Sequence, residues 1–326
     1  MELELLCPRG VSRLDVARAL ADAHRARVHR IFHADSEPAL VPGTPVFDNL
    51  TLGFEVRRPD GSLVARLVDD LTLQDDLDRH APPKPGWYRI VSDDRRLLNL
   101  VRRTGDPEGD VLAALTPLAD LFGTEPTVED GIVRVTDPDG APVALGAPLP
   151  GERERPCELV TPPLPRRDLV PALHALLAPA RALGLTVAAE AATHIHVDRS
   201  ALEDTRTLRD LVHRWERDGE AIKRAVGTNP ACRRLGAWPP TLRALVDAPG
   251  FTDLSWPAAK ARLANLGLSK FVDLNLKGLA HDLPGKPTIE ARYFPGTMDA
   301  EVVGRWADGV LGLVGSGRER SDLTRR

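Results

Sequence analysis

The chain has 326 residues, 42% of them hydrophobic, and carries a formal net charge of -4. This length and composition allow a large buried core and exclude a chain that is disordered as a whole. The slightly acidic balance argues against nucleic acid or an anionic membrane as the main partner. Three cysteines without paired spacing argue against a disulfide framework and against a cysteine-based zinc site.

No segment approaches the ~18 consecutive apolar residues that a membrane-spanning helix requires. The first residues, Met-Glu-Leu-Glu-Leu-Leu, also lack a basic region ahead of an apolar one. We therefore expect a cytoplasmic protein with no membrane partner. The sequence does not indicate an oligomeric state.

The first part of the chain predicts a strand, a helix and a hairpin. Residues 2–6 read as a short strand, and Ser12 begins a helix with Asp15 at the reciprocal capping position and apolar spacing that reaches Val28. Residues 46–73 predict a hairpin. Its first strand alternates between an apolar face and a face that carries Thr51, Gly53, Glu55 and Arg57.

The middle of the chain is rich in Gly, Pro and Asp and has the weakest periodicity. Residues 104–151 predict an elaborated connection inside one domain, with a helix near 110–122 and a strand near 132–136. A short strand then follows at 157–161 and carries Glu158. An apolar-striped helix begins near Asp168.

The stretch from Thr186 to Asp198 has the strongest polar signal. Read as one strand, it places Val and Ala side chains on one face. The other face then carries Glu190, His194, His196 and Asp198. Two imidazoles and two carboxylates on one face are more ionisable groups than a strand with only a structural role usually carries.

The last part of the chain repeats this two-faced character. A strand over residues 286–297 directs Glu290 and Arg292 to the same face, because they are two residues apart. A closing helix is predicted from Asp299 to about Val314. Several strands thus share an apolar face that can pack on helices and a second face with ionisable groups. Such a polar face needs counterions, and a divalent cation with phosphate would supply them.

Five segments together are similar to the amidoligase family, within the superfamily of glutamine synthetase and glutamate-cysteine ligase. They occur in matching order between about residues 45 and 315: Gly53-Phe-Glu55, Cys157-Glu-Leu-Val-Thr-Pro162, Thr193-His-Ile-His196, Leu274-Asn275, and Thr288-Ile-Glu-Ala-Arg292 with Pro295-Gly-Thr297. The resemblance implies an α+β fold with a curved antiparallel sheet of the glutamine-synthetase type, backed by helices on one face. It also implies a single catalytic domain over residues 1–326, with a lead-in at 1–45, a core at 46–315 and a flexible tail at 316–326.

The activity that the resemblance implies is an ATP-dependent and magnesium-dependent ligation of a carboxylate to an amine through an acyl phosphate, with manganese as a substitute metal. The substrates would be small molecules or peptides. By position, the implied metal ligands are Glu55, Glu158, His194 and Glu290. Arg292 and Glu290 would act in catalysis, and His196, Arg233 and Arg234 would face the nucleotide phosphates.

One position departs from the family pattern. The early strand of the family carries Glu-x-Glu, whereas this chain has Glu55-Val-Arg57. A cation thus replaces a metal-binding carboxylate. Three outcomes are then open: one metal is missing, a nearby Asp69, Asp70 or Asp93 replaces the ligand, or the site is specialised or degenerate.

Two alternatives stay open on the sequence alone. Arg57 favours a catalytically reduced module that binds a nucleotide or a peptide. The His194-x-His196-x-Asp198 spacing favours a zinc-dependent hydrolase, although position 199 is Arg where such a signature continues with His. The same two histidines could also form a hydrogen-bonded cluster that has only a structural role.

Overall fold

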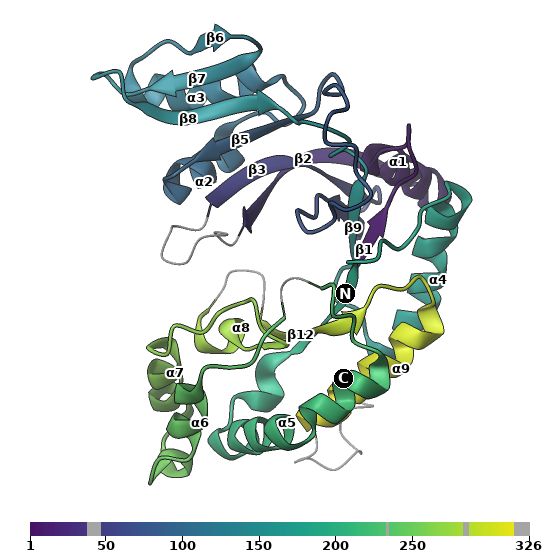
Figure 1. Cartoon of the computed structure of the whole chain (residues 1–326), viewed down its shortest axis with the longest axis vertical. Coiled ribbons are helices and arrows are strands. Elements are labelled where there is room, and N and C mark those ends of the chain that lie inside the picture. The colour runs from purple at the N-terminus through teal and green to yellow at the C-terminus, as the bar shows by residue number, and fades with distance from the viewer. Residues whose placement is uncertain (38–46, 233–234, 283–286, 316–326) are drawn as a thin grey trace. The chain divides into compact units, whose positions relative to one another are not determined.

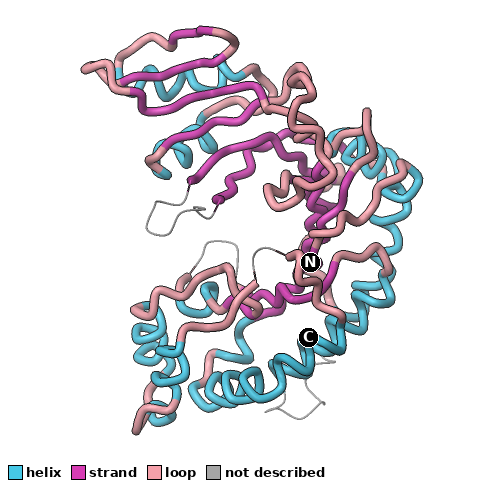
Figure 2. The backbone as a smooth tube through the Cα atoms, in the orientation of Figure 1, coloured by secondary structure: helices cyan, strands magenta, loops and turns pink. Residues whose placement is uncertain are grey.

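The computed structural model describes residues 1–37, 47–232, 235–282 and 287–315 (Figure 1). The chain divides into two compact units. One contains residues 1–3, 164–174 and 189–326, and the other contains residues 4–163 and 175–188. Among the described residues there are twelve strands and nine α-helices, and the strand pairs described inside each unit are antiparallel. Figure 2 colours the helices and strands along the backbone. The predicted mixture of helices with an antiparallel sheet is confirmed.

The single catalytic domain over residues 1–326 stays a prediction, because two compact units can belong to one catalytic domain. We call them the C-terminal unit, which contains residues 189–326, and the N-terminal unit, which contains residues 4–163. The predicted tail at 316–326 lies outside the described residues. No helix in the described ranges is long and apolar enough to cross a membrane.

The C-terminal unit is built on three strands in the order β11 (Leu274–Asn275), β12 (Thr288–Pro295) and β10 (Ala192–Asp198). The first residues of β1 (Glu2–Leu6) pair with β10. Helices α5 (Thr205–Val226) and α9 (Ala300–Gly315) pack on these strands through aromatic rings. The ring centroids of Trp215 and Tyr293 lie 4.9 Å apart, as do those of Phe294 and Trp306. The remaining elements are α6 (Pro240–Val246), α7 (Trp256–Ala264), α8 (Lys277–Ala280) and two short 3-10 helices. Helix α4 (Arg166–Ala182) contributes residues to both units.

The N-terminal unit is organised around β3 (Phe47–Arg57). One half of β3 pairs with β4 (Leu63–Val68), the other half pairs with β5 (Tyr88–Ser92), and β2 (Arg27–Glu37) pairs along its length. The strands β8 (Pro142–Pro148), β7 (Ile132–Thr136) and β6 (Thr127–Glu129) continue the sheet beyond β5, and β9 (Pro156–Val160) pairs with β4. The predicted hairpin over 46–73 is therefore confirmed as β3 and β4.

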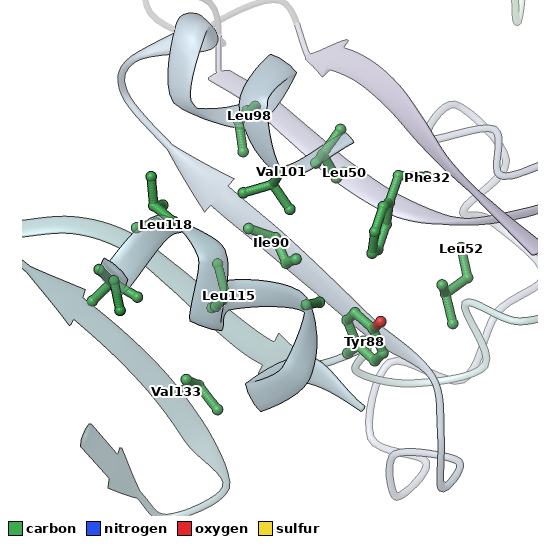
Figure 3. Packing of buried hydrophobic residues seen from close by; sticks show 14 residues of the cluster. Phe32, Leu50, Leu52, Tyr88, Ile90, Leu98, Val101, Leu115, Leu118 and Val133 are labelled. Atoms are coloured by element: carbon green, nitrogen blue, oxygen red, sulfur yellow. The ribbon is translucent and has the colours of Figure 1, made fainter. Parts of the chain in front are cut away.

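Two helices cover one face of this sheet. Side chains of α2 (Arg95–Thr104) and α3 (Val111–Phe122) pack on Leu50 and Ile90 and form a continuous apolar core (Figure 3). Gly146 of β8 permits the close approach of α3, because a Cβ atom there would lie 2.2 Å from Val111 Cγ2. Neighbouring residues of a strand alternate between faces, so Thr51 and Arg89 belong to the opposite face.

The predicted start of the first helix is confirmed and its predicted end is wrong. Helix α1 (Arg13–His24) follows Ser12, which forms the expected capping box with Asp15. The helix stops at Arg25, which has a left-handed φ of 52°, and its N–H bonds back to the last turn. Val28 therefore belongs to β2, where it pairs with Val56. The sequence also missed β2 itself, which pairs with β3 along its whole length, from Arg27 with Arg57 to Glu37 with Phe47.

The core of the N-terminal unit makes a direct prediction about stability. Leu115 of α3 is fully buried against the sheet, whereas Leu121 of the same helix is 60% exposed. We expect Leu115→Ala to lower the free energy of unfolding by about 2–5 kcal/mol, because it removes buried methyl groups and leaves a cavity. Leu121→Ala should change it by less than about 0.5 kcal/mol. Urea denaturation of both variants tests this, and equal effects would contradict the packing described.

Candidate active site

Three strand pairings in the C-terminal unit bring a group of polar side chains together. Glu2 of β1 lies opposite His194 of β10, and His196 of β10 lies opposite Glu290 of β12. Asn275 of β11 lies opposite Glu290 on its other side. Side chains directly opposite each other in antiparallel strands point to the same face and are close neighbours. The register alone therefore builds one polar wall from four strands.

Glu2 connects the two histidines. Its Oε2 atom lies 3.2 Å from Nδ1 of His194, and its Oε1 atom lies 3.1 Å from Nε2 of His196. The sequence interpretation placed residues 2–6 on a strand but did not include Glu2 in the site. The alternation of Glu2 with Leu3 indicates that Glu2 lies on a polar face, but it does not indicate which strand pairs with β1.

Glu290 is buried and is held by two donors. Arg292 Nη1 donates a hydrogen bond to Oε1 of Glu290, and Asn275 Nδ2 donates one to Oε2 at 2.8 Å. Burial alone would raise the pKa of Glu290. The positive charge of Arg292, with a contribution from His196, outweighs burial and lowers that pKa to about 2. Glu290 is therefore an anion at neutral pH, with both oxygens oriented.

The two histidines have different environments. His194 is almost fully buried, and this burial, together with the charge of Arg292, lowers its pKa below the ordinary value. The imidazole of His194 is consequently neutral at pH 7. His196 is more accessible. Thr288 Oγ1 lies 3.3 Å from its Nδ1 atom, which directs Nε2 toward Glu2 and Glu290.

Glu2, His196 and Glu290 can hold a metal ion together. Each offers one ligand atom, and these atoms all lie within 4.8 Å of one another. The Nε2 atom of His196 is 3.1 Å from Glu2 Oε1 and 3.9 Å from Glu290 Oε1. Neighbouring donors around Mg²⁺ lie about 3 Å apart, because each lies about 2.1 Å from the ion. Two carboxylates and one imidazole suit Mg²⁺ or Mn²⁺.

A comparison with models of protein families gives a match over nearly the whole chain. A family model described as "putative amidoligase enzyme" matches residues 1–314. The chain belongs to the amidoligase family. Neither the curated proteins nor the solved structures contain a significant match to it. Membership of the amidoligase family indicates a ligase-like enzyme.

The amidoligase wall contains four of the residues singled out in the sequence: His194, His196, Glu290 and Arg292. Two of their predicted neighbours, Glu190 and Asp198, differ from the predicted strand pattern. Strand β10 begins only at Ala192, and Glu190 lies in the turn before it. The prediction of one strand over residues 186–198 is therefore wrong. Glu190 was predicted to share a face with His194 because one continuous strand was assumed. The turn interrupts that strand, so the alternation no longer places Glu190 on this face.

Asp198 has a local structural role. It ends β10, and its side chain accepts a hydrogen bond from the backbone N–H of Ser200 at 2.7 Å. This bond caps the short 3-10 helix that follows. The side chain is exposed. The Asp of the His-x-His-x-Asp pattern is therefore a helix-capping residue in this structure.

The other predicted metal ligands belong to the N-terminal unit of the amidoligase. Glu158 is partly buried on β9, where it pairs with Val68. Glu55 lies on β3 and is bound by two arginines: Arg57 Nη2 approaches its Oε2 at 2.7 Å, and Arg66 Nη2 approaches its Oε1 at 2.5 Å. Burial would raise the pKa of Glu55, but these hydrogen bonds outweigh it and lower the pKa. Metal binding by Glu55 and Glu158 stays a prediction.

Three aspartates were considered as replacements for the missing family carboxylate. Asp69 is buried and accepts a hydrogen bond from Arg153 at 2.6 Å. Asp70 accepts bonds from the backbone N–H and the hydroxyl of Thr72, both at 2.7 Å. Asp93 is exposed. Asp69 and Asp70 are thus engaged in local structure. The predicted phosphate contacts Arg233 and Arg234 lie outside the described residues.

The pairing of Glu290 with Arg292 generates a testable prediction. We expect Arg292→Gln to lower the free energy of unfolding by about 3–5 kcal/mol, because it leaves a buried carboxylate without its cation. Adding Glu290→Gln should restore part of the loss, since the double variant no longer contains the unpaired charge. Arg305→Gln on the exposed surface of α9 is the control and should change stability little. Urea denaturation gives the free energy of unfolding of the unaltered protein and of the three variants. An Arg292 variant as stable as the Arg305 variant would contradict the pairing.

Proposed function

We propose that this amidoligase is an ATP-dependent carboxylate-amine ligase that forms an amide bond through an acyl phosphate. The observation that carries the proposal is the group of Glu2, His196 and Glu290, with the Arg292 guanidinium bound to one of its carboxylates. A site for a hard cation beside a fixed arginine is what phosphoryl transfer from ATP requires.

We also propose that the strands belong to a curved sheet of the glutamine-synthetase type. Two features support this. The strand pairs inside each unit are antiparallel, and helices cover one face of the sheet in the N-terminal unit. In the C-terminal unit, α5 and α9 contact β12 through Tyr293 and Phe294, while Glu290 and Arg292 join the polar wall.

Charge balance supports a cation in this wall. A histidine binds a metal only as the neutral imidazole, so a cation held by His196 would meet the two carboxylates of Glu2 and Glu290 and the single positive charge of Arg292. The wall therefore has a net negative charge that a divalent cation would compensate. Mg²⁺ bound by Glu2, His196 and Glu290 would neutralise phosphate charge and orient the phosphoryl group for attack.

The proposed reaction needs no nucleophile from the protein. A carboxylate oxygen of the substrate attacks the γ-phosphorus of ATP and ADP leaves, which gives an acyl phosphate. An amine then attacks the acyl carbon, phosphate leaves, and the amine loses a proton to give the amide. Arg292 would donate hydrogen bonds to the developing negative charge. The neutral His194 would position Glu2 through its Nδ1 atom. The substrates would be a small or peptide carboxylate and an amine, and the compartment would be the cytoplasm.

A catalytically reduced module that binds a nucleotide or peptide is the second candidate. The Arg57 contact with Glu55 favours it, because the carboxylate of Glu55 receives an arginine where the family pattern places a second Glu. Such a module would bind ATP or a peptide without turnover. A zinc-dependent hydrolase that uses His194 and His196 is the third candidate, supported by the position of Glu2 beside both imidazoles.

The first prediction of the proposal concerns turnover. We expect pools of amines and carboxylates with Mg-ATP to release ADP and phosphate and to give a condensed product. Glu290→Gln should lower this activity at least about 100-fold, because it removes a cation ligand. His174→Gln, at an exposed position of α4, should leave it unchanged. Mass spectrometry of the products, together with phosphate release, measures the reaction. ATP binding without product would favour the reduced module.

The second prediction concerns the metal. Asn275 contacts Glu290 but is not itself in the group of cation ligands. We expect Asn275→Ala to weaken Mn²⁺ binding about 10–100-fold, because the carboxylate loses the donor that orients it. Asn265→Ala, on the exposed end of α7, is the matched control. Titration followed by Mn²⁺ electron paramagnetic resonance gives the affinities.

The same titration tests the zinc alternative. Stoichiometric zinc that excess Mg²⁺ does not displace, and that is lost on replacing His194 or His196, would contradict the ligase proposal. An Asn275 variant that binds Mn²⁺ as tightly as the unaltered protein would contradict the assigned role of Glu290.

A further inference from the structure

The N-terminal unit contains a cavity of about 250 Å³ on the sheet face opposite α2 and α3. Its floor comes from the sheet, where Thr51 of β3 and Arg89 of β5 lie directly opposite each other. Ala147, which has a small side chain, is the partner of Arg89 on β8. The register of three strands thus fixes a hydroxyl and a cation side by side.

Two loops complete the cavity. Residues 71–79 and 149–153 supply its walls, and the backbone N–H of Asp78 donates to Glu152 Oε2 at 3.1 Å. Gly151 allows the loops to meet, because its φ is +63° and a Cβ atom there would lie 2.8 Å from the carbonyl oxygen of Asp78. Apolar side chains share the lining with the polar ones: Leu71, Leu77, Leu149 and Pro150.

The charges of the lining leave two arginines uncompensated. Arg153 is neutralised by Asp69 at 2.6 Å, and Glu152 pairs with Arg9 and Arg155. Among the described residues, Arg89 is half-buried without an ion-pair partner, and Arg79 contacts only the neutral Gln74, at 3.5 Å. A half-buried guanidinium without an anion is costly, so the cavity favours a negatively charged occupant.

Thr51 gives independent evidence for a ligand. Its side chain is 1% exposed, and in the described part of the chain its Oγ1 atom has no hydrogen-bond partner. A buried hydroxyl without a partner is unfavourable unless something else accepts its hydrogen bond. Thr51 lines the cavity beside Arg89, so a rotation of its side chain about χ1 would bring the hydroxyl to an anion that receives a hydrogen bond from Arg89.

We propose that this cavity binds a small organic carboxylate that carries an apolar group. The carboxylate accepts hydrogen bonds from Arg89 and Thr51, and the apolar group packs on the leucines and Pro150. The volume lies below the range of about 300–1,000 Å³ that is typical of drug-sized ligands, which disfavours a nucleotide. Binding itself does not depend on the ligase reaction. Only the further step, that this ligand is the carboxylate substrate, rests on the proposed function.

The test uses the chain of 326 residues without ATP or metal. Butanoate, hexanoate and glutarate are titrated and followed by ligand-observed nuclear magnetic resonance, with butanamide and hexanamide as neutral controls. We expect the carboxylates to bind and the amides to bind at least about tenfold more weakly. Arg89→Gln should weaken carboxylate binding about tenfold or more, because it removes a charge-assisted hydrogen bond. Arg102→Gln, exposed on α2, is the matched control.

Thr51→Val separates a binding role from a structural one. Valine keeps the shape of threonine but removes the hydroxyl without a partner, so the midpoint of urea unfolding should stay the same or rise. Carboxylate binding should nevertheless weaken about tenfold. Absence of binding by all three carboxylates, equal binding of the amides, or tighter binding of inorganic phosphate would overturn the proposal. A failed ligase assay would leave the binding result intact and would overturn only the substrate assignment.

Discussion

The candidate site depends on keeping two carboxylates ionised inside a largely buried wall. Glu290 is 8% exposed, and removing such a group from water costs several kcal/mol unless charges and donors compensate it. Arg292 and Asn275 supply that compensation from the same strand and the neighbouring strand. The antiparallel register then sets His196 opposite Glu290 and His194 opposite Glu2. One arginine for two carboxylates leaves the negative charge that makes the wall suitable for a cation.

Strands of the N-terminal unit also have one apolar face and one polar face, but the polar face there carries different side chains. There, Leu50 and Ile90 contribute to the helix-covered core, while Thr51 and Arg89 line a cavity on the other face. Glu55, further along β3, is bound by Arg57 and Arg66. The C-terminal unit has a wall with two carboxylates, and the cavity of the N-terminal unit has two arginines, Arg79 and Arg89, that form no ion pair in the described part of the chain. The wall thus favours a cation, and the cavity favours a carboxylate.

Period-two alternation predicted much of the C-terminal wall, because His194, His196, Glu290 and Arg292 are each placed by their own strand. Glu2 was missed because its role depends on the pairing of β1 with β10, almost two hundred residues away, which no local pattern reveals. Glu190 was misplaced because a turn interrupts the apparent alternation before Ala192. The pairing of Glu55 with two arginines was also not predictable, since Arg66 comes from the neighbouring strand β4 at a register that the hairpin turn fixes. The capping box at Ser12 was predictable because its partners are only three residues apart.

Anomalous diffraction from a crystal soaked with Mn²⁺ and a non-hydrolysable ATP analogue tests the central claim most directly. The account predicts a manganese peak within ligand distance of Glu2, His196 and Glu290, with a phosphate oxygen of the analogue in the same coordination shell. A peak held by His194 and His196 alone, or phosphates bound far from Glu290 and Arg292, would contradict it.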